Sequence, residues 1–138
     1  MKRLFQLVTV FICLNLLFLT VSAASDRASQ QIRSYRMDAY AASSREICIE
    51  FSVTGVGVMK ELGAEKIAIY EKDGSKWNLV NSLHRDDLDM TASNTYTYGN
   101  SFSCKVASGN EYRVNVTIFA EDKGGNSDRR TQQFFINT

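Results

Sequence analysis

Alternation of apolar and polar residues is the feature that most limits what this chain can fold into. Apolar side chains occupy every second position from Ile47 to Val53, and again from Tyr112 to Ala120. A period of two is typical of strands that bury one face, whereas a surface helix repeats every 3.6 residues. These two segments are the clearest strands in the chain and predict an all-β, antiparallel fold.

Turn residues separate further extended segments. Asp73-Gly74 offers the positive φ that a tight hairpin needs. One short helix is expected at Val58 to Leu62, stopped by Gly63, where the chain would pass between sheets. Seven short strands favour a two-sheet sandwich of the immunoglobulin or fibronectin III type over a barrel. The other five strands are expected at Ile32 to Ala41, Lys66 to Glu71, Trp77 to Val80, Ser101 to Val106 and Arg130 to Ile136.

The amino terminus predicts export. Lys2 and Arg3 precede an uncharged apolar stretch that ends in small residues at Ala23, as in a helical signal peptide covering residues 1–23. Residues 24–31 then form a polar lead-in, and residues 32–138 a single β-sandwich domain. The alternative is an uncleaved membrane anchor, because the apolar stretch approaches the roughly 20 residues that span a bilayer. We expect cleavage, and therefore an extracellular protein whose only membrane contact would be an uncleaved leader.

The charge balance argues against a polyanionic partner. The leader takes two of the 16 basic residues and none of the 15 acidic ones, which leaves 14 against 15 and a formal charge of −1. Nucleic acids and anionic membrane surfaces are bound by strongly basic patches. We therefore expect no nucleic-acid partner. The remaining length of about 115 residues suits one domain, and we expect a monomer.

Cysteine usage agrees with export. Cys13 leaves with the leader, so Cys48 and Cys104 remain as an even pair. In an oxidising compartment such a pair predicts one disulfide, worth about 4 kcal/mol in the chain-entropy model. The alternative is two free cysteines or a reactive thiol pair, although no Cys-x-x-Cys spacing supports redox chemistry.

Two resemblances follow from these segments. Gly109 to Val116 resembles the penultimate strand of fibronectin III and immunoglobulin-like domains, which implies that Tyr112 packs into the core and hydrogen-bonds nearby backbone. Segments 51–59, 62–64, 67–74 with Trp77, and 99–120 resemble a family of small secreted Firmicutes proteins of unknown function. That resemblance implies a Gram-positive exported protein and brings no activity or site residues with it.

Catalytic and metal chemistry have little support. His84, the only histidine, lies in a polar connection without a nucleophile motif, so a hydrolase centred on it is a minor alternative. One histidine and two cysteines make no ordinary zinc site. The acidic segments 86–89 and 122–128 do not follow the EF-hand pattern, and turn chemistry accounts for Asp122 and Asn126. We expect no enzyme, no metal and no cofactor.

Aromatic side chains are the best candidates for ligand contact. Trp77, Tyr96 and Tyr98 lie where a core role is not forced, and exposed rings bind sugars or peptides through apolar contact. In the alternative, Trp77 fills the core and the tyrosines pack at an edge. The sequence therefore favours a secreted, non-enzymatic module that binds an extracellular protein or glycan. The alternative function is a secreted toxin, a bacteriocin-like effector or a signalling protein.

Overall fold

The structure, a computed structural model, describes residues 30–138. The predicted signal peptide and most of the lead-in lie outside the described residues. Within them every regular element is a strand, and no helix is long and apolar enough to cross a membrane. The strands are β1 (Ile32–Ser43), β2 (Glu46–Asp73), β3 (Lys76–His84), β4 (Thr91–Lys105), β5 (Glu111–Glu121) and β6 (Ser127–Asn137).

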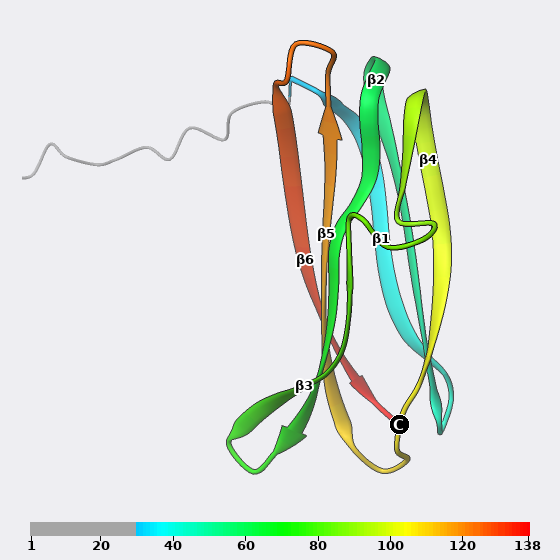
Figure 1. Ribbon diagram of the computed structural model, residues 1–138. Coiled ribbons are helices and arrows are strands. Elements are labelled where there is room, and N and C mark those ends of the chain that lie inside the picture. The colour runs from blue at the N-terminus through cyan, green and yellow to red at the C-terminus, as the bar shows by residue number, and fades with distance from the viewer. Residues whose placement is uncertain (1–29) are drawn as a thin grey trace, which may run out of the picture.

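The long strand β2 organises the fold. Its first half pairs with β1 on one side and β4 on the other, and its second half pairs with β5 and β3. Figure 1 shows β2 rising beside β1, bending over at the top and descending beside β5. Because β2 belongs to both halves, the six strands form one antiparallel sheet that curls on itself. The all-β, antiparallel prediction is confirmed, but hydrogen bonding joins six strands in one sheet where we expected seven in two.

The expected helix at Val58 to Leu62 is wrong. This segment is part of β2, and Met59, Glu61 and Leu62 pair with β4. A register irregularity between Thr54 and Met59 bends the strand. It also leaves both Met59 and Leu62 buried. Because these two residues are three positions apart, the apolar pattern looks like one face of a helix. The two strands predicted on either side of the segment are therefore one continuous strand.

The hydrophobic core lies between the two halves of the curled sheet. The alternating residues that defined the two clearest strands all face it: Ile47, Ile49, Phe51 and Val53 from β2, and Tyr112, Val114, Val116 and Ile118 from β5. Met90 from the connection between β3 and β4 is fully buried with them. Each of the larger side chains contributes about 1.5–3 kcal/mol through burial. The period-two pattern therefore predicted the inward face correctly.

Tyr112 behaves as its resemblance implied. It lies at the start of the penultimate strand, is 1% exposed, and donates its hydroxyl hydrogen to the Ala107 carbonyl oxygen at 3.0 Å. The hydrogen bond satisfies the one polar atom of an otherwise apolar buried side chain. This expectation is confirmed, and it fixes the connection between β4 and β5 against the core.

Hydrogen bonds to Asp122 hold the turn that joins the end of β5 to the start of β6. Asp122 Oδ1 accepts hydrogen bonds from the backbone N–H groups of Gly124 and Asn126, and Asp122 Oδ2 accepts one from the Asn126 side chain. These bonds lower the pKa of Asp122, with the Asn126 side chain as the largest cause. Gln31 is buried here and donates its backbone N–H to Asp128 Oδ2 at 2.7 Å. Gln31, the last residue of the expected lead-in, is therefore held against the turn between β5 and β6.

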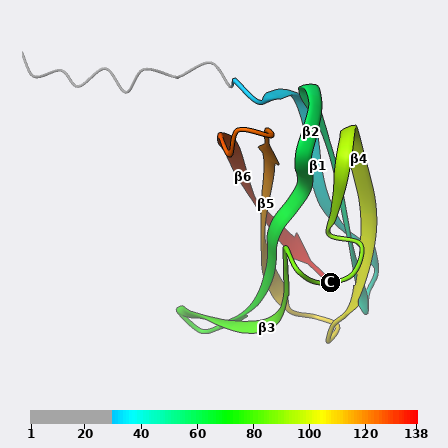
Figure 2. The same cartoon turned by 45° about the horizontal axis from the view of Figure 1, so that its top comes forward.

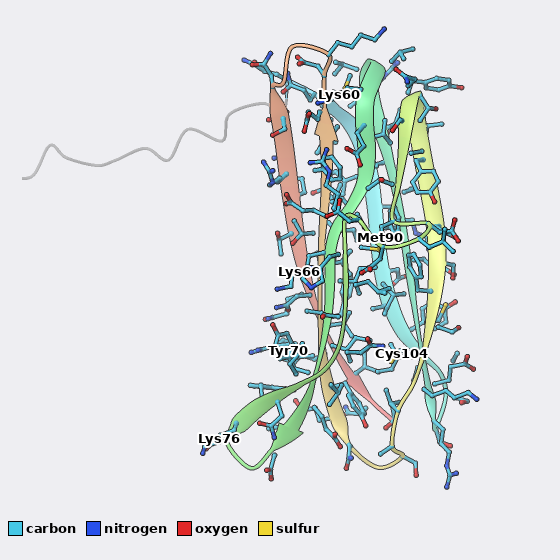
Figure 3. The ribbon with its side chains drawn as sticks, viewed as in Figure 1. Lys60, Lys66, Tyr70, Lys76, Met90 and Cys104 are labelled. Atoms are coloured by element: carbon cyan, nitrogen blue, oxygen red, sulfur yellow. The ribbon has the colours of Figure 1, made fainter. Side chains whose placement is uncertain are left out.

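The end of β2 and β3 form a hairpin that projects from the body of the sheet. Both Figures 1 and 2 show it extending away at the lower left. Gly74, with φ of 59°, makes the predicted tight turn at its tip. Figure 3 places Lys76 at the tip and Tyr70 at the base. The candidate site lies at the base of this hairpin.

Candidate functional site

A row of side chains crosses the outer face of four neighbouring strands at the base of the hairpin. Tyr70 of β2 lies opposite Leu79 of β3 on one side and Arg113 of β5 on the other. Arg113 in turn lies opposite Phe135 of β6. Trp77, which lies opposite Lys72 two pairs further towards the tip, completes the group. We call these five residues, Tyr70, Trp77, Leu79, Arg113 and Phe135, the Arg113 surface.

A bulge in β3 makes this row possible. Ile69 pairs with Asn81 but the next residue, Tyr70, pairs with Leu79, so Val80 is an extra residue. A shift of one residue moves a strand's side chains to the other face of a sheet. Without the bulge, Val80 would lie opposite Tyr70 and Leu79 would face the core side. The bulge therefore places Leu79 beside Tyr70 on the outer face.

Arg113 is held between aromatic rings. Its guanidinium carbon lies 4.6 Å from the centre of the Tyr70 ring and 4.9 Å from that of Trp77. Trp77 also packs against Phe135, with ring centres 5.9 Å apart and an angle of 55°. A cation over an aromatic face is attracted by the ring quadrupole, by about 0.5–1 kcal/mol at exposed sites and more when desolvated. The rings therefore fix the orientation of the guanidinium.

The rim of the Arg113 surface is apolar and open to solvent. Leu79 is 56% exposed and Phe135 is 61% exposed, whereas Tyr70, Trp77 and Arg113 are half-buried. Large apolar side chains that gather on an exposed face mark binding sites more often than isolated ones do. The arrangement offers a fixed cation surrounded by apolar contact area.

The three aromatic residues proposed from sequence are not brought together. Trp77 is on the outer face, so its alternative placement in the core is wrong. Tyr96 is 59% exposed beside the bend of β2, roughly 40 Å from Trp77 along that strand. Tyr98 packs on Phe51 and donates its hydroxyl to the Asp89 carbonyl oxygen. Of the three, Trp77 alone belongs to the Arg113 surface.

The other members of the Arg113 surface were not identified from the sequence, because the register of strand pairing cannot be derived from a single sequence. Alternation placed Arg113 on the solvent side of its strand, but it gave no reason to set it beside Tyr70 and Phe135. The usable signal was that Tyr70, Arg113 and Phe135 each occupy an outward position of a recognisable strand.

The predicted disulfide between Cys48 and Cys104 is absent, and both residues are free cysteines. The reason is register: Cys104 pairs directly with Ile47, and Cys48 pairs with Ser103. The two thiols therefore point to opposite faces of the sheet. Cys48 Sγ lies 3.3 Å from Ser101 Oγ, while Cys104 Sγ accepts a hydrogen bond from Asn81 Nδ2 at 3.3 Å.

A cavity of about 190 Å³ opens between β3 and β4, each of which pairs with β2. Ile49, Ile67, Leu83 and Phe102 form its apolar wall, and Cys104 also lines it. Figure 3 shows Cys104 on β4, well apart from Tyr70 at the base of the hairpin. The cavity is therefore a concave feature of the inner face, distinct from the Arg113 surface.

His84 has no catalytic arrangement around its ring among residues 30–138. Its Nε2 lies 3.4 Å from Ser82 Oγ, but Asp87 Oδ2 accepts a hydrogen bond from the His84 backbone N–H instead of from the ring. A triad needs an acid that orients the imidazole. In the same part of the chain, no three histidine, cysteine or acidic side chains gather as metal ligands.

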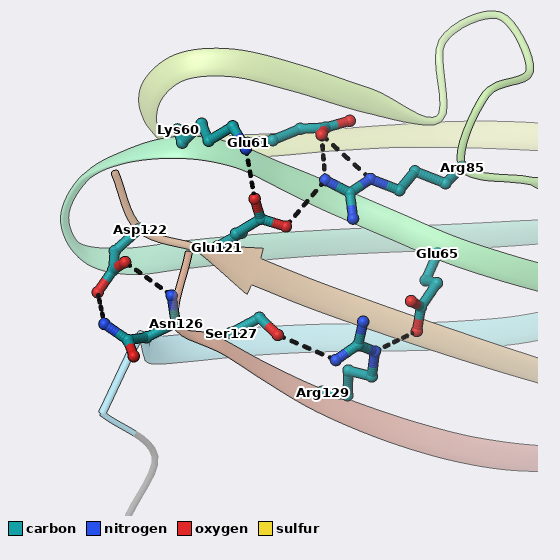
Figure 4. Close-up of polar contacts among 9 residues, drawn as sticks. All are labelled: Lys60, Glu61, Glu65, Arg85, Glu121, Asp122, Asn126, Ser127 and Arg129. Carbon is teal, nitrogen blue, oxygen red and sulfur yellow. Dashed lines mark hydrogen bonds and ion pairs between the residues drawn. The ribbon is translucent and has the colours of Figure 1, made fainter. Parts of the chain in front are cut away.

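An ion-pair network covers the outer face near the other end of β5 (Figure 4). Arg85 lies over the Phe119 ring, binds Glu61, and donates from Nη2 to Glu121 at 3.1 Å. Lys60 Nζ pairs with Glu121 at 2.8 Å. The Arg85 hydrogen bond is the largest cause that lowers the pKa of Glu61, and the Lys60 hydrogen bond is the largest that lowers the pKa of Glu121. Both Lys60 and Arg85 have a carboxylate partner here, whereas Arg113 has none within the part of the chain that the structure describes.

Comparison with known proteins supports the fold alone. No family model matches the chain, and no curated protein matches it. It is similar in structure to a putative ApaA protein from Bordetella pertussis, with a TM-score of 0.53 and 7% identity over 80% of this chain and 98% of that one. Two weaker similarities have TM-scores below 0.5 and carry no argument. They are the sporulation control protein Spo0M of Bacillus subtilis (0.44, 12% identity, 76% of this chain and 50% of that one) and a superoxide reductase (neelaredoxin) of Ignicoccus hospitalis (0.36, 8%, 78% and 82%).

Proposed function

We propose that this chain is an exported, non-enzymatic binding module that recognises an extracellular protein through the Arg113 surface. The observation that carries the proposal is the position of Arg113 over the rings of both Tyr70 and Trp77, with exposed Leu79 and Phe135 at the rim. Tryptophan, tyrosine and arginine are the residues most enriched among energetic hot spots of protein interfaces. The signal-peptide pattern at residues 1–23 supports the extracellular location.

A protein partner fits the surface better than a glycan does. Sugars stack on an open aromatic face, but both Arg113 and Lys72 lie over the Trp77 ring, at 4.9 and 5.7 Å from its centre. The most exposed members of the surface are instead an aliphatic side chain and the phenyl ring of Phe135. Such a mixture of apolar rim and fixed arginine is typical of the centre of a protein interface. The resemblance to small secreted Firmicutes proteins agrees with an exported role.

Selection of peptides from a random phage-displayed library on the immobilised protein tests the proposal. Selected peptides should bind the wild type and lose at least about tenfold in affinity to a Leu79→Ser, Phe135→Ser variant, because two exposed apolar anchors are removed. Tyr96→Ser, which removes an exposed aromatic outside the surface, is the matched control and should bind as the wild type does.

Two results would overturn the proposal. One is that the selected peptides bind the Leu79→Ser, Phe135→Ser variant as tightly as the wild type, with its fold verified by circular dichroism. The other is that no peptide binds while a glycan array yields ligands whose binding depends on Trp77.

A further inference from the structure

Arg113 carries a charge that no side chain among residues 30–138 neutralises. Among residues 30–138 its guanidinium makes no ion pair, and its Nε is the one buried side-chain nitrogen or oxygen without a hydrogen-bond partner. Arg85, which is also half-buried, contacts two glutamates. Lys72, the nearest other cation over Trp77, is paired with Glu111 at 2.7 Å. Arg113 therefore stands out as a fixed and uncompensated cation.

Leaving such a group unpaired is costly. A buried donor without a partner loses its hydration and regains nothing, and the penalty is larger for a charged group than for a neutral one. Because Nε itself is enclosed, a ligand meets the outer nitrogens of this half-buried side chain, and a negative group there supplies the counter-charge that residues 30–138 do not. The rings of Tyr70 and Trp77 already hold the guanidinium in place, so little further ordering is needed at that moment.

We propose that Arg113 receives a carboxylate from the ligand, so that the Arg113 surface selects an acidic side chain flanked by apolar ones. This inference rests on the proposed function and names the chemistry of its partner. The planar guanidinium matches the two oxygens of a carboxylate, and such charge-assisted bonds are about twice as strong as neutral ones. Leu79 and Phe135 supply the apolar contact on either side.

Charge count favours a carboxylate over a phosphate. A carboxylate brings one negative charge, and Arg113 offers one unpaired positive charge because Lys72 is already engaged with Glu111. A phosphate monoester carries close to two charges at neutral pH and is bound by clusters of arginines. The surface has a single uncompensated cation in an aromatic frame, which suits an aspartate or glutamate of a partner protein.

The test uses two blocked dipeptides that differ only in charge, phenylalanyl-glutamate and phenylalanyl-glutamine. Trp77 is the only tryptophan in the chain, so its fluorescence reports directly on ligands that reach the surface. At pH 7 and low salt, the acidic dipeptide should bind with millimolar affinity and about tenfold more tightly than its amide. Glucuronate and inorganic phosphate are titrated in the same way, as the sugar-carboxylate and phosphate arms of the test. Equal binding of the two dipeptides, or tighter binding of either arm than of the acidic dipeptide, would overturn the inference.

Variants of the purified protein separate this inference from the proposed function. Arg113→Met should abolish the tenfold preference while both dipeptides still bind weakly through the apolar rim. Arg45→Met, which removes an exposed arginine from the turn between β1 and β2, should leave the preference intact. If peptides selected on the surface carry no acidic residue and bind Arg113→Met as they bind the wild type, this inference fails and the proposed function stands. If no peptide depends on Leu79 and Phe135, the proposed function fails.

Discussion

The guanidinium carbon of Arg113 lies 4.9 Å from the centre of the Trp77 ring although the two residues belong to strands that do not pair with each other. Strand β2 runs between them, and Trp77 reaches over it from its own position opposite Lys72. The contact therefore depends on two independent strand registers and on the bulge at Val80. It is a relationship that only the folded sheet creates.

Replacing Arg113 by methionine should leave the stability of the protein nearly unchanged. The variant loses two cation–π contacts, worth about 1–2 kcal/mol together. It also removes a buried donor without a partner, which is a gain of about 1–3 kcal/mol. We expect the free energy of unfolding, measured in urea, to stay within about 1 kcal/mol of the wild type. A loss above about 2 kcal/mol would mean that Arg113 is a structural residue.

The cysteines should behave as two unrelated free thiols. Because Cys104 pairs with Ile47 and Cys48 lies on the other face, a reducing agent should not change the melting temperature. The Cys48→Ser, Cys104→Ser variant should lose less than about 1 kcal/mol, whereas loss of a disulfide closing this loop would cost about 4 kcal/mol. Alkylation followed by mass spectrometry should label both residues, with half-buried Cys104 reacting before buried Cys48. Protection of both thiols that disappears on reduction would contradict this.

Sequence reasoning succeeded where the information is local and failed where it depends on register. Alternation correctly identified Ile47 and Val114 as inward-facing, and Gly74 as the hairpin turn. It could not show that Cys48 and Cys104 are offset by one residue across a strand pair, which decides whether they can bond. For the same reason the sequence pointed to Trp77 but not to Arg113 and Phe135, which reach it through three strand pairings.

Gly63 is the glycine whose replacement should be most damaging. Its φ is +149°, and a Cβ atom there would lie 2.3 Å from the carbonyl oxygen of Met90, a buried backbone group that also accepts a hydrogen bond from the Ala64 N–H. Gly63→Ala should therefore lower the free energy of unfolding by at least about 2 kcal/mol, through a backbone clash and an unfavourable φ. Gly57→Ala is the matched control, since a Cβ there meets nothing within 4 Å. Equal urea midpoints for the two variants would contradict the close packing of β2 against the β3–β4 connection.

The ion-pair network should make stability fall with acid. The pKa values of Glu61 and Glu121 are lowered in the folded state by Arg85 and Lys60, from an ordinary value of 4.5. A lowered folded pKa means that the unfolded chain binds protons first, so the stabilisation is complete above about pH 5 and is lost as the pH falls through 4.5 and below. The urea midpoint should thus drop between pH 6 and pH 4.

The Glu61→Gln, Glu121→Gln variant tests this. Its urea midpoint should be lower than that of the wild type at pH 6, and it should drop less between pH 6 and pH 4. Glu46→Gln, which removes a glutamate without an ion pair among residues 30–138, should leave the drop as large as in the wild type. If the double variant and the wild type lose the same amount, the network does not determine the acid sensitivity of this fold.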